Sequence, residues 1–486
     1  MTGPRSVSSG DVNEGTDTEP ATVIELAGAV RRGERSAVAA TEAALERARI
    51  DAAAGAAGLN AFVAIDADLA LEAAQRVDEL VARGEDPGPL AGVPFGVKDL
   101  EDCAGLPTSH GSLLRRDDPP ATADSVHVAR LRAAGAVPIG KTAAPEFGTL
   151  NFTKTKLFGV TRNPWNPDRT PGGSSGGSAA AVSAGMVPFA TASDGGGSTR
   201  IPAGFAGLVG HKASFGRIPS PGPDGSLTAV VGALTTTVAD AARHLDVAAG
   251  PDDRDRVSLP EPGISYESCI EDLAVTGLRT RWSTDLGFAT VDPEVEALAR
   301  AAAESLAATA QLAMEEGPVV LTDPVRTWLS SGSLDLWFSV SPDEHRDRAD
   351  DLTAFSRYSL DQTVARTAPQ IARDQRRRHQ LALDVARLFD DIEVLLTPTT
   401  AVPAFDAAGP PRAEVEGEVV EGAMVTPFTM LANLCWNPSI SVPAGVTADG
   451  LPVGLMITAR RHRDDQCLRL ARILEQVRPW PRLAPT

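Results

Sequence analysis

Apolar residues recur at three- and four-residue spacing in several stretches of the chain, which is the pattern of amphipathic helices. These stretches are 21–32, 36–50, 68–83, 127–134, 237–248, 294–313 and 466–477, and a shorter Ala-rich helix is expected at 179–185. Each of these helices can bury one apolar face. The chain therefore supplies helices along most of its length.

Short apolar runs at 93–97, 137–139, 187–191, 394–396 and 439–442 alternate with the helices and predict buried strands. This alternation, without an internal repeat or a clear linker, predicts one large α/β domain over 21–486. Within it we expect a catalytic core at about 90–240. A variable helical cap is expected at about 322–370, where Trp328, Trp337 and many charges lie.

Two stretches are too polar or too rich in glycine for regular structure. Residues 1–20 are rich in Gly, Ser, Thr and acids and are expected to form a disordered tail. Residues 163–178 are rich in Pro, Gly and Ser and are expected to be irregular.

Composition narrows the possible functions. The chain is 43% hydrophobic with a formal charge of −19, which argues against a nucleic-acid-binding face. No run of 18 apolar residues predicts a membrane span. The four cysteines are far apart, which fits a reducing compartment such as the cytoplasm. Because the histidines and cysteines show no ligand spacing, neither a metal nor another cofactor is expected.

Residues 135–142 match the phosphate-binding string G-x-x-x-x-G-K-[ST] letter for letter. A phosphate loop needs backbone N–H groups that point inward, between a strand and a helix. Pro138 has no N–H, and the apolar run 137–139 places a strand inside the match. We therefore do not expect a nucleotide site.

A second motif, G-x-S-x-G at 172–176, is the serine elbow of α/β-hydrolases. An elbow requires a strand directly before Ser174, whereas residues 166–171 predict a loop. An α/β-hydrolase with Ser174 as nucleophile stays open as an alternative.

The third pattern is wider. Two glycine-rich runs, 172–178 and 194–198, place Ser198 24 positions after Ser174, and Lys98 follows the apolar run 93–97. Only five of the 45 basic residues are lysines, and all five lie within 98–212. An arginine cannot lose its proton in a protein, but a buried lysine can. The pattern thus places two serines and a possible base in one region.

These residue types suit amide hydrolysis, which needs a nucleophile, a base and N–H donors for the oxyanion. A serine hydroxyl both donates and accepts, so Ser174 could pass a proton from Ser198 to a neutral Lys98 amine. Glycines 195–197 allow close backbone approach to one oxygen.

These segments resemble the amidase signature family from about residue 22 to residue 478. Further stretches that carry the resemblance are 59–63, 140–142, 145–148, 163–166, 395–399, 441–445 and 451–454. The resemblance implies an α/β/α fold with a central mixed sheet flanked by helices. It also implies an amidohydrolase that acts on carbon–nitrogen bonds other than peptide bonds, and possible carbamate or ester cleavage.

The resemblance also assigns roles to individual residues. It implies that Ser198 is the nucleophile, Ser174 the bridging serine after a cis peptide bond, and Lys98 the general base. The implied oxyanion donors are the N–H groups of Gly195, Gly196, Gly197 and Ser198. Ser175, Asp194 and Arg200 are implied as supporting neighbours.

Specificity is less readable. Gly195 stands where the family more often has a side chain, which suggests a wider pocket, and residues 211–217 also depart from the family pattern. Phe147, Gly148, Thr149 and Trp436 are candidate pocket residues, although core packing is an equal reading for Trp436. Lys154 and Lys156, like the arginines at 376–378, are expected to be solvated.

Two alternatives within this frame stay open. The chain could be the ammonia-releasing subunit of a tRNA-dependent amidotransferase, or a binding protein that has kept the fold. The expected partner is a small-molecule amide or carbamate, with no nucleic acid and no membrane, and the chain is expected to be a monomer or homodimer.

Overall fold

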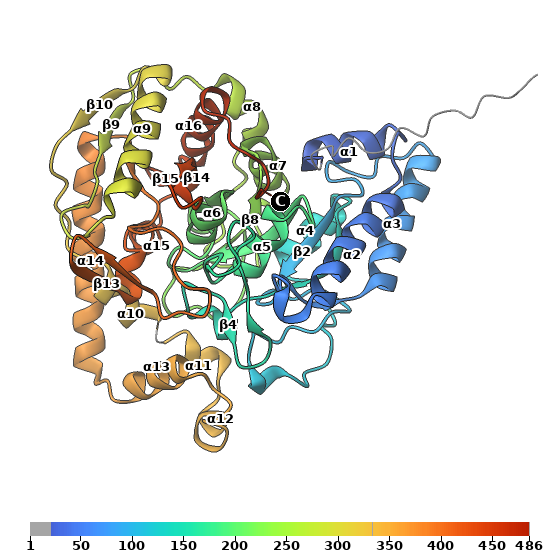
Figure 1. Ribbon diagram of the computed structural model, residues 1–486, viewed down its shortest axis with the longest axis horizontal. Coiled ribbons are helices and arrows are strands. Elements are labelled where there is room, and N and C mark those ends of the chain that lie inside the picture. Colours follow the sequence, from blue (N-terminus) through green and yellow to red (C-terminus); the bar gives the residue numbers. More distant parts are fainter. Residues whose placement is uncertain (1–20, 333, 486) are drawn as a thin grey trace, which may run out of the picture.

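The computed structural model describes residues 21–332 and 334–485, and it is built on an eleven-stranded mixed sheet (Figure 1). The strand order is β1-β3-β2-β6-β8-β7-β14-β15-β11-β9-β10. The tail expected at residues 1–20 lies outside the described residues. The strands of this sheet are β1 Phe62–Ile65, β2 Pro94–Lys98, β3 Val137–Thr142, β6 Phe189–Asp194, β7 Val209–Lys212, β8 Val230–Thr235, β9 Arg279–Trp282, β10 Ala313–Glu316, β11 Val394–Pro398, β14 Ser439–Val446 and β15 Pro452–Ala459.

Helices flank this sheet, and all eight helices predicted from periodicity are present with ends shifted by a few residues. The helices are α1 Val23–Arg31, α2 Ala37–Ala53, α3 Ala67–Ala82, α4 Val126–Ala133, α5 Gly176–Ser183, α6 Arg200–Ala206, α7 Val238–Ala248, α8 Tyr266–Asp272, α9 Pro293–Ala310, α10 Val325–Gly332, α11 Leu336–Ser339, α12 Pro342–Asp347, α13 Ala354–Val364, α14 Ala368–Asp391, α15 Met430–Leu434 and α16 Asp464–Val477. Two small hairpins complete the structure, β4 Lys154–Thr155 with β5 Gly159–Val160, and β12 Arg412–Val415 with β13 Glu418–Glu421.

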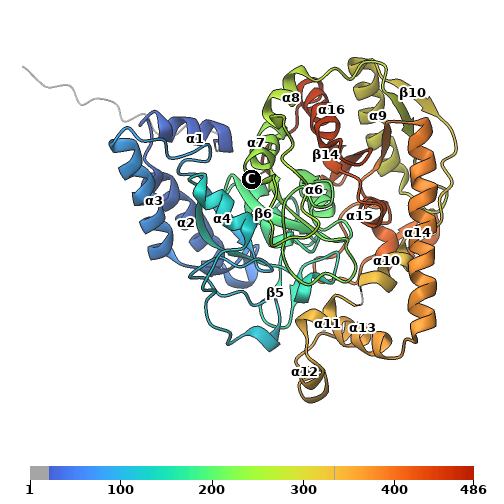
Figure 2. The same cartoon turned by 180° about the vertical axis from the view of Figure 1, so that it is seen from behind.

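The central part of the sheet is buried on both faces, which explains why strands such as β11, β14 and β15 are largely apolar. Along β11, Val394 and Leu396 enter one hydrophobic cluster and Leu395 enters another. The first cluster is covered by α7, α8, α9 and α16, and the second by α6, α14 and α15 (Figure 2). Successive side chains of a strand point to opposite faces of the sheet, so one apolar strand contributes side chains to both hydrophobic clusters.

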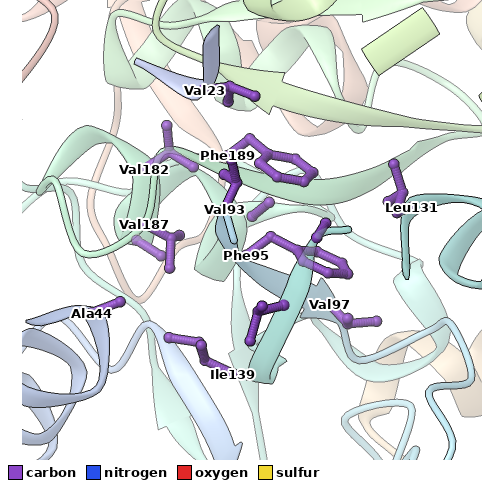
Figure 3. Packing of buried hydrophobic residues seen from close by; sticks show 14 of the residues in the cluster. Val23, Ala44, Val93, Phe95, Val97, Leu131, Ile139, Val182, Val187 and Phe189 are labelled. Atoms are coloured by element: carbon purple, nitrogen blue, oxygen red, sulfur yellow. The ribbon is translucent and has the colours of Figure 1, made fainter. Parts of the chain in front are cut away.

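A third cluster packs β2, β3 and β6 against the N-terminal helices and α5 (Figure 3). Phe95 of β2 and Phe189 of β6 are direct neighbours in the parallel pairing, and their rings stack with centroids 5.1 Å apart. This packing holds the ends of β2 and β6 side by side. Those two ends carry Lys98 and Asp194.

One local prediction needs revision, and another agrees with the structure. The segment expected to be irregular at 163–178 ends earlier, because α5 begins at Gly176. A Cβ on Gly177 would lie 2.2 Å from the Ala143 backbone nitrogen, so only glycine lets α5 come this close to the end of β3. The Gly140-Lys141-Thr142 string lies within β3 itself, paired with β1 and β2, and forms no phosphate loop.

Several strands were not predicted, namely β1, β7, β8, β9, β10 and β15. Some of them are short or carry charges: β7 contains His211 and Lys212, and β10 is exposed along most of its length. Strands such as β7 and β10 depend on pairing with their neighbours and not on their own pattern, whereas β8 and β15 are fully buried, mostly apolar runs.

Helices α10–α13 form the cap expected near 322–370, and α11–α13 lie below the body of the molecule in both views (Figures 1 and 2). Polar contacts attach the cap to the core. Glu146 accepts hydrogen bonds from the Thr353 N–H and hydroxyl at 2.8 and 2.6 Å. The exposed Lys156 donates to the carbonyl of Leu352 at 2.6 Å.

The reading of residues 376–378 as a solvated helix face is wrong for Arg378. Its guanidinium is partly buried and donates to the carbonyls of Ser226 and Leu227. Arg378 thereby joins α14 to the loop before β8. None of the helices among the described residues is long and apolar enough to cross a membrane.

Candidate active site

A cavity of about 250 Å³ lies between the sheet and the cap. Ser174, Ser198, Gly195 and Gly196 line it from the core, together with the three predicted pocket residues at 147–149. The cap contributes residues from α10, α11 and α13, among them Trp328, Asp335 and Phe355. The glycine-rich segments predicted from the sequence therefore meet at one hollow.

Lys98 is the last residue of β2 and is fully buried directly behind the cavity wall. Its Nζ lies 2.8 Å from each of three hydroxyl oxygens, those of Ser174, Ser175 and Ser193. Ser193 was missed in the sequence. The feature of the sequence that could have revealed Ser193 is its position one residue before Asp194, between buried residues at the end of a strand.

The pKa of Lys98 is set by its surroundings. Burial lowers this pKa from 10.5 to about 7, and the charges of Glu101 and Asp194 oppose the shift only in part. A large fraction of the amine is therefore neutral near pH 7. A neutral amine can accept a proton from a neighbouring hydroxyl.

The two serines of the predicted relay face the same cavity. The Gly173–Ser174 peptide bond is cis, as the resemblance implied. The Ser175 N–H donates to the Ser198 carbonyl at 3.3 Å, which joins the two glycine-rich segments. Among the described residues the Ser198 hydroxyl has no hydrogen-bond partner, so it is not yet bonded to Ser174. Catalytic hydrogen bonds often tighten only when substrate binds.

The loop before Ser198 is held through its carbonyl oxygens. The Gly195 carbonyl accepts from Trp328 Nε1 at 2.7 Å, and the Gly196 carbonyl from Thr429 Oγ1 at 2.6 Å. The Gly197 carbonyl accepts from the Ile201 N–H at 2.7 Å. In a trans peptide the C=O and the following N–H point in opposite directions. Each anchor therefore also orients the next N–H of the loop.

These orientations revise the predicted set of oxyanion donors. The Gly197 N–H donates to Asp194 Oδ1 at 2.7 Å, so the expectation that it is a free donor is wrong. Within the described residues, the N–H groups of Gly195, Gly196 and Ser198 have no acceptor. They remain available to an oxygen in the cavity.

Asp194 and Arg200 form a buried ion pair under this loop. Two guanidinium nitrogens of Arg200 reach the two Asp194 oxygens at 2.9 Å, and Asn433 bonds to both side chains. Burial by itself would raise the pKa of Asp194, but the Arg200 charge and its hydrogen bonds lower this pKa to about 2. The charged carboxylate then fixes the N–H groups of Gly197 and Thr199.

Two pocket expectations have different outcomes. A Cβ on Gly195 would have its nearest neighbours at 3.8 to 4.0 Å, so this position leaves open space beside the cavity. Trp436 does not line the cavity. It stacks on Phe215 with ring centroids 4.8 Å apart, and its Nε1 donates to the Leu227 carbonyl.

No group of three or more His, Cys, Asp or Glu residues in 21–332 and 334–485 is arranged to hold a metal ion. All four cysteines are free thiols.

Comparisons with known proteins by family model, sequence and structure give consistent matches over most of the chain. The family model described as Amidase matches residues 39–468. An acylamidase of Rhodococcus erythropolis is 36% identical over 442 residues, covering 87% of this chain and 89% of that protein. A glutamyl-tRNA(Gln) amidotransferase subunit of Synechococcus sp. is 35% identical over 474 residues, covering 92% and 95%. The solved structure of a bacterial aryl acylamidase superposes with a TM-score of 0.87 at 28% identity, covering 95% and 96%.

Replacing Arg200 by Gln is expected to destabilise the fold because it leaves the Asp194 charge buried without a partner. The expected loss in free energy of unfolding is about 3–5 kcal/mol at pH 7.5. In the wild type the low pKa of Asp194 gives stability that is present above about pH 4 and is lost only as pH falls towards about 2. In the variant burial raises this pKa, so the loss should shrink as pH falls from 7.5 to 5.

Equilibrium urea unfolding at both pH values measures the effect. The matched control is Arg254→Gln, which breaks an exposed pair with Asp252 and should change the midpoint little. Equal losses in the two variants, or a loss that is the same at both pH values, would contradict the role assigned to Arg200.

Proposed function

The chain belongs to the amidase signature family, and on this premise we propose that it is a free-standing amidohydrolase that acylates Ser198. Membership makes it a hydrolase of carbon–nitrogen bonds other than peptide bonds. One observation carries the finer proposal. A buried Lys98 amine lies 2.8 Å from Ser174 Oγ, behind a cavity that both Ser174 and Ser198 line.

In the proposed acylation step, Ser198 Oγ attacks the carbonyl carbon of a small-molecule amide. Its proton passes to Ser174 Oγ, whose own proton passes to the neutral Lys98 Nζ. Collapse of the tetrahedral intermediate breaks the C–N bond, and the departing amine takes a proton back along the same path. Water then attacks the acyl carbon and gives up a proton along the same path. The carboxylic acid leaves, and the Ser198 hydroxyl is restored.

The negative oxygen of the intermediate is proposed to lie against the N–H groups of Gly196 and Ser198, with Gly195 as a third donor. Such donors act in a water-poor site and require no reorganisation during the reaction. Ser175 and Ser193 are proposed to hold the Lys98 amine in place, because each hydroxyl is 2.8 Å from Nζ.

The amidotransferase reading rests on the 35% identity to the Synechococcus protein. We favour a free-standing enzyme because Gly195 and residues 211–217 depart from the family pattern. Carbamates and esters of suitable shape are proposed as further substrates, and the chain is proposed to act in the cytoplasm as a monomer or homodimer. Activity of the chain purified alone separates the two readings.

Acyl-enzyme mapping tests the proposal directly. The purified chain is screened with aryl anilides, aliphatic amides and aryl carbamates, and intact mass is followed for an added acyl group. We expect the group on Ser198 and no turnover by Ser198→Ala with an unchanged thermal midpoint. Modification mapped to Ser174 would favour the elbow reading, and glutaminase activity only with added partner subunits would favour the amidotransferase.

The pH profile reports the charge of Lys98. Because the base acts when neutral, kcat/KM should rise with pH through about 7 along a single-proton limb and then level off. Lys98→Arg cannot lose its proton, so kcat/KM should fall by a factor on the order of 10² or more.

The control for this substitution is Lys154→Arg, which changes an exposed lysine that donates to the Ala408 carbonyl. Lys154→Arg should keep the wild-type kcat/KM and the same acid limb of the pH profile. A folded Lys98→Arg enzyme with most of its activity, or with the same acid limb, would place the base elsewhere.

Trp328→Phe should lower kcat by about tenfold with little change in KM. The ring still fills the space beside Gly196, where a Cβ would lie 2.5 Å from the indole, but the hydrogen bond to the Gly195 carbonyl is lost. The Gly196 N–H is then oriented less well. Removing an oxyanion donor altogether lowers kcat by a factor of about 10²–10³, so a misoriented donor should lower kcat by less.

A trifluoromethyl ketone mimics the oxyanion, so its affinity should fall in parallel with kcat, whereas the affinity of the product acid should not. Trp337→Phe is the control, because Trp337 lies in the cap but does not line the cavity. A rise in KM without a change in kcat would assign Trp328 to substrate packing alone.

A further inference from the structure

The walls of the cavity are mostly apolar, with one charged exception. Leu100, Phe147, Trp328, Leu336 and Phe355 contribute apolar or aromatic surface. Of the described residues that line the cavity, Asp335 alone has an acidic or basic side chain. Placing a charged carboxylate in apolar surroundings costs free energy unless the charge is paired.

Asp335 is held in a defined orientation at the start of α11. Its Oδ1 accepts the backbone N–H groups of Gly225 and Ser226 at 2.9 and 2.8 Å. These bonds fix one oxygen and solvate the charge in part, but they bring no positive charge. No ion pair to Asp335 is present in the described part of the chain.

The neighbouring charges do not neutralise this carboxylate. Burial raises the pKa of Asp335, and the nearby negative charge of Asp224 adds to this rise. Arg378 lies near both acids and donates to the carbonyls of Ser226 and Leu227, not to either carboxylate. Its single positive charge offsets one of the two negative charges of Asp224 and Asp335. This end of the cavity therefore carries net negative charge.

We propose that Asp335 selects substrates that carry a cationic group, a protonated amine, away from the scissile C–N bond. This inference rests on the proposed function, because it names the substrate class of the same site. The ammonium would pair with Asp335, and its positive charge also suits the aromatic faces of Trp328 and Phe355. A neutral substrate of the same shape leaves the charge unpaired, and an anionic one is repelled.

A purely structural role would be to tie the loop at 224–228 to the cap through the two N–H bonds. Asp335→Asn separates the two roles, because an amide oxygen can still accept both bonds while the charge is removed. Asp224→Asn is the matched control. It removes a nearby charge that does not line the cavity and should keep the substrate preference.

The experiment compares isosteric 4-nitroanilides in two arms. One arm uses ω-aminoacyl anilides of increasing chain length, each paired with the methyl-ended and carboxylate-ended analogues. The other places an aminomethyl group on the leaving aniline, paired with ethyl. In one of the two arms, the wild type should hydrolyse the cationic substrate with a kcat/KM roughly tenfold higher than that of its neutral isostere. If this is the ω-aminoacyl arm, the preference should be largest at one chain length.

In Asp335→Asn this ratio should fall towards one, whereas Asp224→Asn should keep it. Equal kcat/KM for cationic and neutral anilides in both arms, or a preference that survives Asp335→Asn, overturns the inference and leaves the proposed function standing. Absence of any hydrolysis together with absence of acyl-Ser198 would instead overturn the proposed function.

Discussion

The burial of one amine is the constraint on which the site depends. Lys98 ends a strand that is paired on both sides, so its side chain is fully buried, and its amine is held by three serine hydroxyls and the Ser193 carbonyl. Desolvation disfavours the ammonium form, and the pKa falls to about 7. An amine that can be neutral near pH 7 is thus a consequence of where the strand lies in the sheet.

The glycine loop at 195–197 has no side chains of its own, so its orientation depends on contacts from other parts of the molecule. Each of its carbonyls is fixed by a different part of the molecule. Trp328 comes from the cap, Thr429 from the segment before α15, and Ile201 from α6. Asp194 holds the remaining Gly197 N–H and is itself held by Arg200. The loop consists of glycines, and contacts from other parts of the molecule hold it in place.

The cap therefore contributes both to the wall of the cavity and to the position of the glycine loop. Its residues close the cavity, and one of them orients the peptide that precedes Gly196. The contacts of Glu146 with Thr353 and of Lys156 with Leu352 keep the cap on the core. A hydrophobic cluster of Leu114, Leu336, Val340, Leu352 and Leu360 also packs the cap against the core.

The sequence by itself determined the elements with strong periodicity and the grouping of Lys98, Ser174 and Ser198. Helices such as α9 and buried strands such as β11 follow from local apolar patterns, which need no knowledge of neighbours. Tertiary structure decided the rest. Strands such as β7 exist through pairing, Ser193 joins Lys98 because β6 lies beside β2, and Trp436 packs on Phe215. The direction of each N–H in the glycine loop depends on residues far along the chain, which no local pattern encodes.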